Sequence, residues 1–119
     1  MTAYLECTSD INPFQTVQLL LENNDLKSYS VYQDYKITED KEKEIAILVF
    51  EKLFIRNGSS GSLTVIVDNF SQITQVKCIS SGTGQGLLNI DWRAGKSFIN
   101  LIKNQLDSHI MEITKEDTE

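Results

Sequence analysis

The residues that first suggest chemistry lie in the stretch SSGTGQGLLNIDW, residues 80–92, which holds three of the six glycines and the only tryptophan. A glycine-rich loop can cradle a phosphate when it joins a strand to the N-terminus of a helix. Here the glycines alternate as G-x-G-x-G, and Leu87 stands where the dinucleotide fingerprint has its third glycine. The LLNI that follows is typical of a strand. The pattern therefore predicts a bulged or strongly twisted crossing between strands, not a phosphate site.

A second glycine motif, GKS at residues 95–97, also lacks part of its pattern. A P-loop has a glycine five residues before the glycine of GKS, and Ile90 occupies that position. We interpret Lys96 and Ser97 as the first turn of a final helix.

The residue types used in catalysis and metal binding are sparse. His109 is the only histidine, and the cysteines Cys7 and Cys78 lie far apart, so they do not supply a zinc ligand set. Asp68 and Asp91 could form a carboxylate pair, but their positions are typical of a turn and a helix cap. The chain has no G-x-S-x-G motif. These observations favour a non-catalytic protein with a structural histidine, no metal and no cofactor.

A second hypothesis keeps a ligand or substrate site near the glycine-rich stretch. If that region is open to solvent, a small molecule would bind in a pocket between a sheet and helices. The mouth of this pocket would be formed by Gly82, Gly84, Gly86, Asp91, Trp92 and Arg93.

Two helices that would position the candidate site residues are predicted from apolar residues that recur at helical spacing. Asn12, Pro13 and Gln15 form an N-terminal capping signature, and the helix ends at residues 23–25. Its predicted core stripe is Phe14, Val17, Leu20 and Leu21. A final helix has a second stripe of Phe98, Leu101, Ile102, Leu106 and Ile110.

Strands are predicted where the apolar period becomes two. Residues 1–9 form a first strand, and residues 28–37 place Tyr29, Val31, Tyr35 and Ile37 on one face. Residues 45–50 are apolar on both faces. Beyond a turn at residues 58–61, the inward side chains are predicted to be Leu63, Val65, Val67, Thr74, Val76 and Cys78.

These elements predict an α+β fold: an antiparallel meander sheet of about five to six strands with two helices packed on one face. The order is one strand, one helix, four or five strands and a helix, similar to the TATA-binding-protein-like fold. A looser resemblance is to helix-grip folds. Residues 1–113 form a single domain, and the acidic residues 114–119 are predicted to be a frayed tail.

Charge and hydropathy exclude several classes of protein. Lys and Arg number 11 and Asp and Glu 17, giving a net charge of −6, and no basic stripe suits a nucleic acid. No apolar run is long enough to span a membrane, and no signal peptide is recognisable. We expect a cytoplasmic location, where the cysteines stay reduced. The charged run at residues 39–44 is interpreted as a solvated turn.

A family resemblance is carried by residues 48–70 and 81–98, most specifically by VDNF and by the glycine-rich stretch that ends in DW. These segments resemble a family of small uncharacterised proteins from Gram-positive bacteria. The resemblance implies a bacterial, cytoplasmic, single-domain protein, and it supplies no activity, cofactor or catalytic residue.

The surplus of apolar residues at positions 45–50, with Tyr32 and Phe54, points to an interface. We therefore expect a non-catalytic binding or interaction module that forms a homodimer through the open face of its sheet.

Overall fold

One antiparallel sheet and a layer of helices make up this computed structural model, which describes residues 2–54, 59–83 and 98–117. The predicted α+β fold with an antiparallel sheet is confirmed. In chain order the elements are β1 (Thr2–Ser9), α1 (Pro13–Leu21), α2 (Asn24–Tyr29), β2 (Ser30–Ile37), β3 (Glu44–Phe54), β4 (Ser59–Asp68), β5 (Thr74–Thr83), a helical segment at residues 98–106, the 3₁₀ turn η1 (Asp107–His109) and β6 (Ile110–Asp117).

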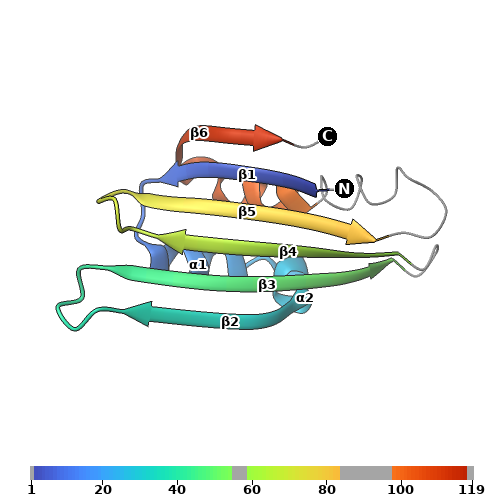
Figure 1. Cartoon of the computed structure of the whole chain (residues 1–119), viewed down its shortest axis with the longest axis horizontal. Helices are drawn as coiled ribbons and strands as arrows, with labels where there is room; N and C mark the ends of the chain where they lie inside the picture. Colours follow the sequence, from blue (N-terminus) through green and yellow to red (C-terminus); the bar gives the residue numbers. More distant parts are fainter. Residues whose placement is uncertain (1, 55–58, 84–97, 118–119) are drawn as a thin grey trace.

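The sheet has six strands in the order β2-β3-β4-β5-β1-β6 (Figure 1). Strands β2 to β5 form the expected meander, in which each strand pairs with the next one along the chain. Strand β1 then pairs with β5 on one side and with β6 on the other. The first and last strands of the described chain are therefore neighbours, and β2 and β6 are the two edges.

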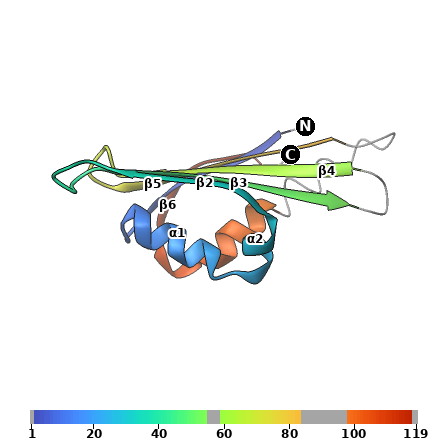
Figure 2. The ribbon, with the colours of Figure 1, turned by 90° about the horizontal axis from the view of Figure 1, so that it is seen from below.

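The core lies between the sheet and the helices, which all cover the same face (Figure 2). Side chains alternate along each central strand, so every second residue points into this core. The inward positions predicted for β4 and β5 are confirmed as buried. The largest fully buried side chains include Leu5, Leu48, Phe50 and Leu63 from the strands, with Leu20, Leu26, Phe98, Ile99, Ile102 and Leu106 from the helical layer.

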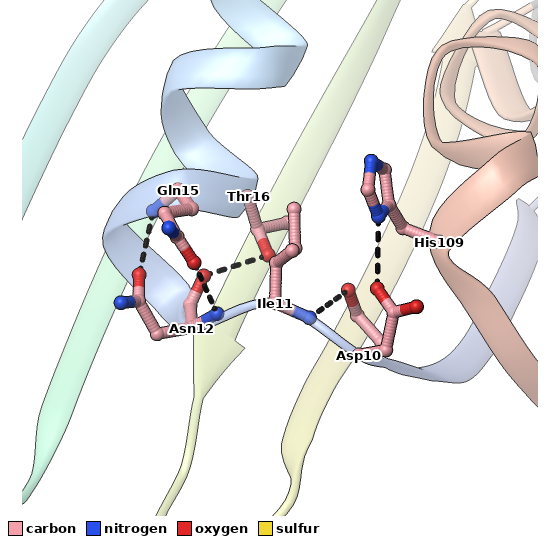
Figure 3. Close-up of polar contacts among 7 residues, drawn as sticks. Asp10, Ile11, Asn12, Gln15, Thr16 and His109 are labelled. Atoms are coloured by element: carbon pink, nitrogen blue, oxygen red, sulfur yellow. Dashed lines mark hydrogen bonds and ion pairs between the residues drawn. The ribbon is translucent and has the colours of Figure 1, made fainter.

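The start of α1 follows its sequence signature (Figure 3). The Asn12 side chain accepts a hydrogen bond from the Gln15 amide at 2.8 Å, and the Gln15 side chain accepts one from the Asn12 amide at 3.1 Å. The predicted core stripe of this helix is partly wrong. Phe14 is 46 % exposed, whereas Thr16 is buried and donates its hydroxyl to the Asn12 carbonyl. A threonine can enter the core because that bond satisfies its hydroxyl.

The chain after α1 also differs from prediction. Helix α1 ends at Leu21, close to the predicted end at residues 23–25, but a second helix that was not predicted, α2, follows at once. The Asn23 side chain caps α2 by accepting from the Leu26 amide. In β2, a register shift between Ser30 and Tyr32 interrupts the expected alternation. Val31 is exposed, and so are Tyr35 and Ile37, which were also expected on a buried face. Strand β2 is an edge strand whose hairpin end extends past the helices (Figure 2).

The predicted frayed tail is wrong for residues 114–117, which belong to β6. The outer edge of β1 offers unpaired backbone groups, and β6 satisfies them. The Thr114 hydroxyl donates to the Glu6 carbonyl at 3.1 Å, and Lys103 forms an ion pair with Glu116 at 2.8 Å. The charged residues that suggested a solvated tail suit an exposed edge strand equally well.

Candidate functional site

Only one of the six residues proposed to line a ligand pocket is among the residues that the structure describes. Gly82 lies in β5, where it pairs with Gly61 of β4. Two glycines opposite each other leave the sheet without side chains at this point of both strands. The other five predicted residues lie outside the described residues: Gly84, Gly86, Asp91, Trp92 and Arg93.

A histidine and a carboxylate do meet, at the end of β1 (Figure 3). His109 Nδ1 lies 2.8 Å from Asp10 Oδ1, and the Asp10 amide donates to the His109 carbonyl at 3.0 Å. The second imidazole nitrogen points away from Asp10 in Figure 3. The neighbouring Ser9 hydroxyl accepts a hydrogen bond from the Ile11 amide at 3.4 Å. The pair joins the β1–α1 connection to η1, and none of the hydrogen bonds given for the described residues aligns a serine with the imidazole, as a Ser-His-Asp site requires.

The two cysteines lie on neighbouring strands, because Cys7 pairs with Val76 and Leu5 pairs with Cys78. Both thiols are free and buried on the helix-covered side. Burial raises the pKa of the Cys7 thiol to about 11, helped by the Glu116 carboxylate, and burial likewise raises the pKa of Cys78. Such thiols stay protonated at neutral pH and are poor nucleophiles. Within residues 2–54, 59–83 and 98–117, no three ligand-type side chains gather for a metal ion.

Glu44 is a buried carboxylate that the sequence analysis placed in a solvated turn. Its Oε1 accepts hydrogen bonds from the Phe14 amide at 3.2 Å and from the Tyr35 hydroxyl at 2.9 Å. This carboxylate therefore stabilises the N-terminal turn of α1, where anionic groups are favourable. Burial raises the pKa of Tyr35, and so do the hydrogen bond and the charge of Glu44. The role of Glu44 is to join β3, β2 and α1.

The described helices cover one face of the sheet (Figure 2), and apolar side chains gather on the opposite face. We call it the open face. On β3, Ile45, Ile47 and Val49 alternate with the buried residues and are only partly exposed. Beside them lie Ile66 of β4, Ile79 of β5, Tyr4 of β1 and Tyr32 of β2. A sheet with one solvated face normally alternates apolar and polar residues. Strand β3 does not.

Charged residues of both signs surround these apolar side chains on the open face. The cross-strand pairing places Asp34 beside Ile47, Lys77 beside Ile66, and Glu6 between Lys77 and Lys115. Asp34 and Lys36 form an exposed ion pair at 3.7 Å, which contributes little in water. The open face therefore has an apolar centre and a mixed-charge border, which is the usual anatomy of a protein–protein interface.

A shallow hollow of about 300 Å³ lies on the same face, over β5, β1 and β6. Its lining includes Ile79 and Tyr4, with the ammonium of Lys115 5.0 Å from the centre of the Tyr4 ring. The hollow is lined by both apolar and charged side chains. It lies on the opposite side of the sheet from the pocket that the second hypothesis requires.

Sequence reasoning missed two parts of this arrangement. Glu44 is in phase with Ala46, Leu48 and Phe50, so the period of two could have moved it from the turn to the buried face. The hollow joins Tyr4, Lys77 and Lys115, which come from three separate parts of the chain. Their meeting depends on β1 lying between β5 and β6, and no local pattern encodes that order.

Comparisons with known proteins give a family and no activity. Residues 2–110 match a model described as a family of unknown function, DUF6054. No curated protein matches the chain. A crystal structure of an uncharacterized protein from Bacillus thuringiensis is similar with 14 % identity and a TM-score of 0.33, over 91 % of this chain and 93 % of that one. In the described part of the chain, no helix has the length and apolar character to cross a membrane.

Proposed function

The chain belongs to the family of unknown function DUF6054, and from this premise we propose that it is a non-catalytic interaction module. It acts as a homodimer that forms through the open face of its sheet.

The observation that carries this proposal is the second apolar face of β3. Ile45, Ile47 and Val49 project away from the helices, and Ile66 and Ile79 extend the apolar surface across β4 and β5. Two sheets pack face to face at about 10 Å through side chains of this kind. Contiguous apolar surface on a protein exterior usually marks an interaction site.

A second copy of the chain fits this surface better than a charged polymer does. The border of the apolar centre carries carboxylates at Glu6, Asp34 and Asp68 as well as the ammoniums of Lys77 and Lys115. Nucleic acid would meet those carboxylates, whereas an identical face supplies both apolar area and charges of either sign. The homodimer is therefore the partner we propose.

The proposal includes a cytoplasmic location in a Gram-positive bacterium. The sequence resemblance supports the origin. The two free, buried thiols support a reducing compartment, where such cysteines persist. Fractionation of the source cells, followed by detection of the protein in the cytoplasmic fraction, tests this part.

The alternative of a ligand pocket between sheet and helices gains no support from the described residues. Leu20, Phe98 and Ile102 fill that space and are buried against the strands.

Sedimentation equilibrium at micromolar concentration tests the homodimer. We expect twice the chain mass of 13.5 kDa for the native protein. Ile47→Lys should shift the mass toward 13.5 kDa, because an ammonium would enter the apolar centre. Ile113→Lys is the matched control, because Ile113 is an exposed isoleucine of β6 that pairs with Cys7 on the other side of the sheet. A native protein that has the monomer mass throughout would overturn the proposal.

A further inference from the structure

The open face is organised in rows that cross the strands. One row contains Asp34, Ile47, Ile66 and Lys77, which are successive partners across β2, β3, β4 and β5. The adjacent row contains Tyr32, Val49, Thr64 and Ile79 on the same four strands. The middle of the first row is apolar, and Asp34 and Lys77 flank it with opposite charges, whereas the middle of the second row pairs Val49 with the polar Thr64. Beyond Lys77 the first row continues to Glu6 of β1 and Lys115 of β6.

Two identical faces that pack with their strands aligned are related by a two-fold axis that runs either across the strands or along them. An axis across the strands sets each strand over its own copy. If that axis follows the row of Asp34, then Asp34 meets Asp34 and Lys77 meets Lys77. If it lies between the two rows, Lys77 meets Ile79 and Asp34 meets Tyr32, so neither charge gains an opposite charge from the second copy. The first arrangement is repulsive, and the second has no complementary charge contact between Asp34 and Lys77.

An axis along the strands, between β3 and β4, gives complementary contacts. It sets β3 over β4 of the second copy, so Ile47 faces Ile66, and it sets β2 over β5, so Asp34 faces Lys77. The symmetry makes each of these contacts twice. We infer that the proposed homodimer has this axis, with Asp34 of each copy paired to Lys77 of the other. The inference rests on the proposed function.

The same axis also brings Tyr32 of one copy to the hollow of the other. Tyr32 is 54 % exposed on the edge strand β2, in the row that ends at Ile79. Under this axis, Tyr32 of one copy faces Ile79 of the other, at the wall of the hollow. Ile79 and Tyr4 are the apolar part of that wall, and a tyrosine packed against such a surface is a frequent centre of binding energy in interfaces.

Sheet twist does not remove this pairing. Face-to-face sheets cross at about 30°, and β2 and β5 lie roughly 7 Å from the axis at a strand spacing of about 4.8 Å. The facing positions are then displaced by about 4 Å, which a lysine side chain spans. An axis at the middle of the sheet, between β4 and β5, would set Ile47 over Glu6 and leave the apolar centre unmatched.

Charge reversal tests the axis through the dimer dissociation constant, measured by sedimentation. Asp34→Lys and Lys77→Glu should each weaken the dimer at least about tenfold, because each creates two like-charge contacts. The double variant should return to within about threefold of the native protein. Lys115→Glu is the control, because Lys115 of β6 lies outside the overlap. Unchanged circular dichroism and melting temperature verify that each variant folds.

A cysteine pair gives a test that does not depend on charge. Mixing Tyr32→Cys with Ile79→Cys protein and adding a bismaleimide cross-linker that spans about 10 Å should give a covalent dimer, because facing sheets are separated by about that distance. The mixture of Tyr32→Cys with Lys115→Cys should give much less, because Lys115 lies on β6, two strands beyond Ile79 of β5.

The outcomes separate this inference from the proposed function. A native dimer that tolerates both charge reversals, or that gives no Tyr32→Cys–Ile79→Cys product, overturns the axis and leaves the homodimer standing. A native monomer overturns both.

Discussion

On the helix-covered face of β3, Leu48 and Phe50 are fully buried, whereas their neighbours Ile47 and Val49 on the open face are only partly buried. The strand is thus apolar on both sides, but the helices account for one side only. The covered face explains why the chain folds. The open face has apolar area that folding leaves in contact with solvent, and this difference is the physical basis for the proposed association.

Substitutions on the two faces of β3 should differ most in how much they lower the free energy of unfolding. Leu48→Ala should lower the free energy of unfolding by about 2–5 kcal/mol, because it leaves a cavity in the core. Ile47→Ala should lower it by roughly half as much or less, because its side chain is only partly removed from water in the monomer. Urea unfolding at concentrations where the chain is monomeric measures both values. Equal losses would contradict the distinction between the faces.

A smaller loss of folding stability is expected when Glu44, a buried carboxylate on the helix-covered face, is replaced. Glu44→Ala should cost about 1–3 kcal/mol, because the Phe14 amide and the Tyr35 hydroxyl lose a charged acceptor. Glu42→Ala, in the same charged run but exposed, should change stability by less than about 0.5 kcal/mol. Thermal or urea unfolding compares the two. Similar values for both variants would refute the structural role of Glu44.

The buried thiols predict a loss of stability at high pH. The Cys7 thiol has a pKa of about 11 in the folded chain against 9.0 as its ordinary value. Between these pH values the unfolded chain has released the proton and the folded chain still holds it. The contribution of each thiol to the free energy of unfolding is therefore fully present below about pH 9. It falls as pH rises toward 11, by at most about 1.4 kcal/mol per pH unit for each thiol.

The comparison protein for that prediction is Cys7→Ala/Cys78→Ala. It should lose stability less steeply than the native protein over the same pH range, measured by urea unfolding at each pH. Identical slopes for the two proteins would show that these thiols do not titrate as their burial implies.

The smallest expected effect concerns the glycine-rich stretch. We predict that Gly84→Ala lowers stability by on the order of 1 kcal/mol if Gly84 has a positive φ, because a Cβ atom is strained there. We also predict that ATP or NAD leaves Trp92 fluorescence unchanged. A saturable change at micromolar nucleotide, lost in a folded Gly84→Ala protein, would favour the ligand-binding hypothesis instead.

Much of the fold was predictable because it rests on local patterns. The capping signature at Asn12 located the start of α1, and the period of two located the buried residues of β4 and β5. The errors lie where tertiary context decides. Phe14 is exposed because the buried face of α1 runs through Pro13, Thr16 and Leu20, and β6 pairs with the edge of β1 that β5 leaves open. The local sequence of α1 does not predict the first outcome, and the local sequence of residues 110–117 does not predict the second.

The candidate site was predictable only in outline. The double apolar pattern of residues 45–50 pointed to an interface, and the structure shows Ile45, Ile47 and Val49 on the open face. The row from Asp34 to Lys77 requires the register of three strand pairs, each of which brings distant residues together. Sequence spacing alone fixes which side chains share a face, but not which of them lie across from one another.

A dilution series observed in the methyl signals of isoleucine tests whether the open face forms the interface of a dimer. The open face carries Ile45, Ile47, Ile66 and Ile79, and the core carries Ile99 and Ile102 as internal references of the same residue type. We predict that the four open-face signals shift or broaden as the protein concentration rises through the dimerisation range, while the two core signals stay in place. Signals that are all independent of concentration, or that change equally on both faces, would contradict the account.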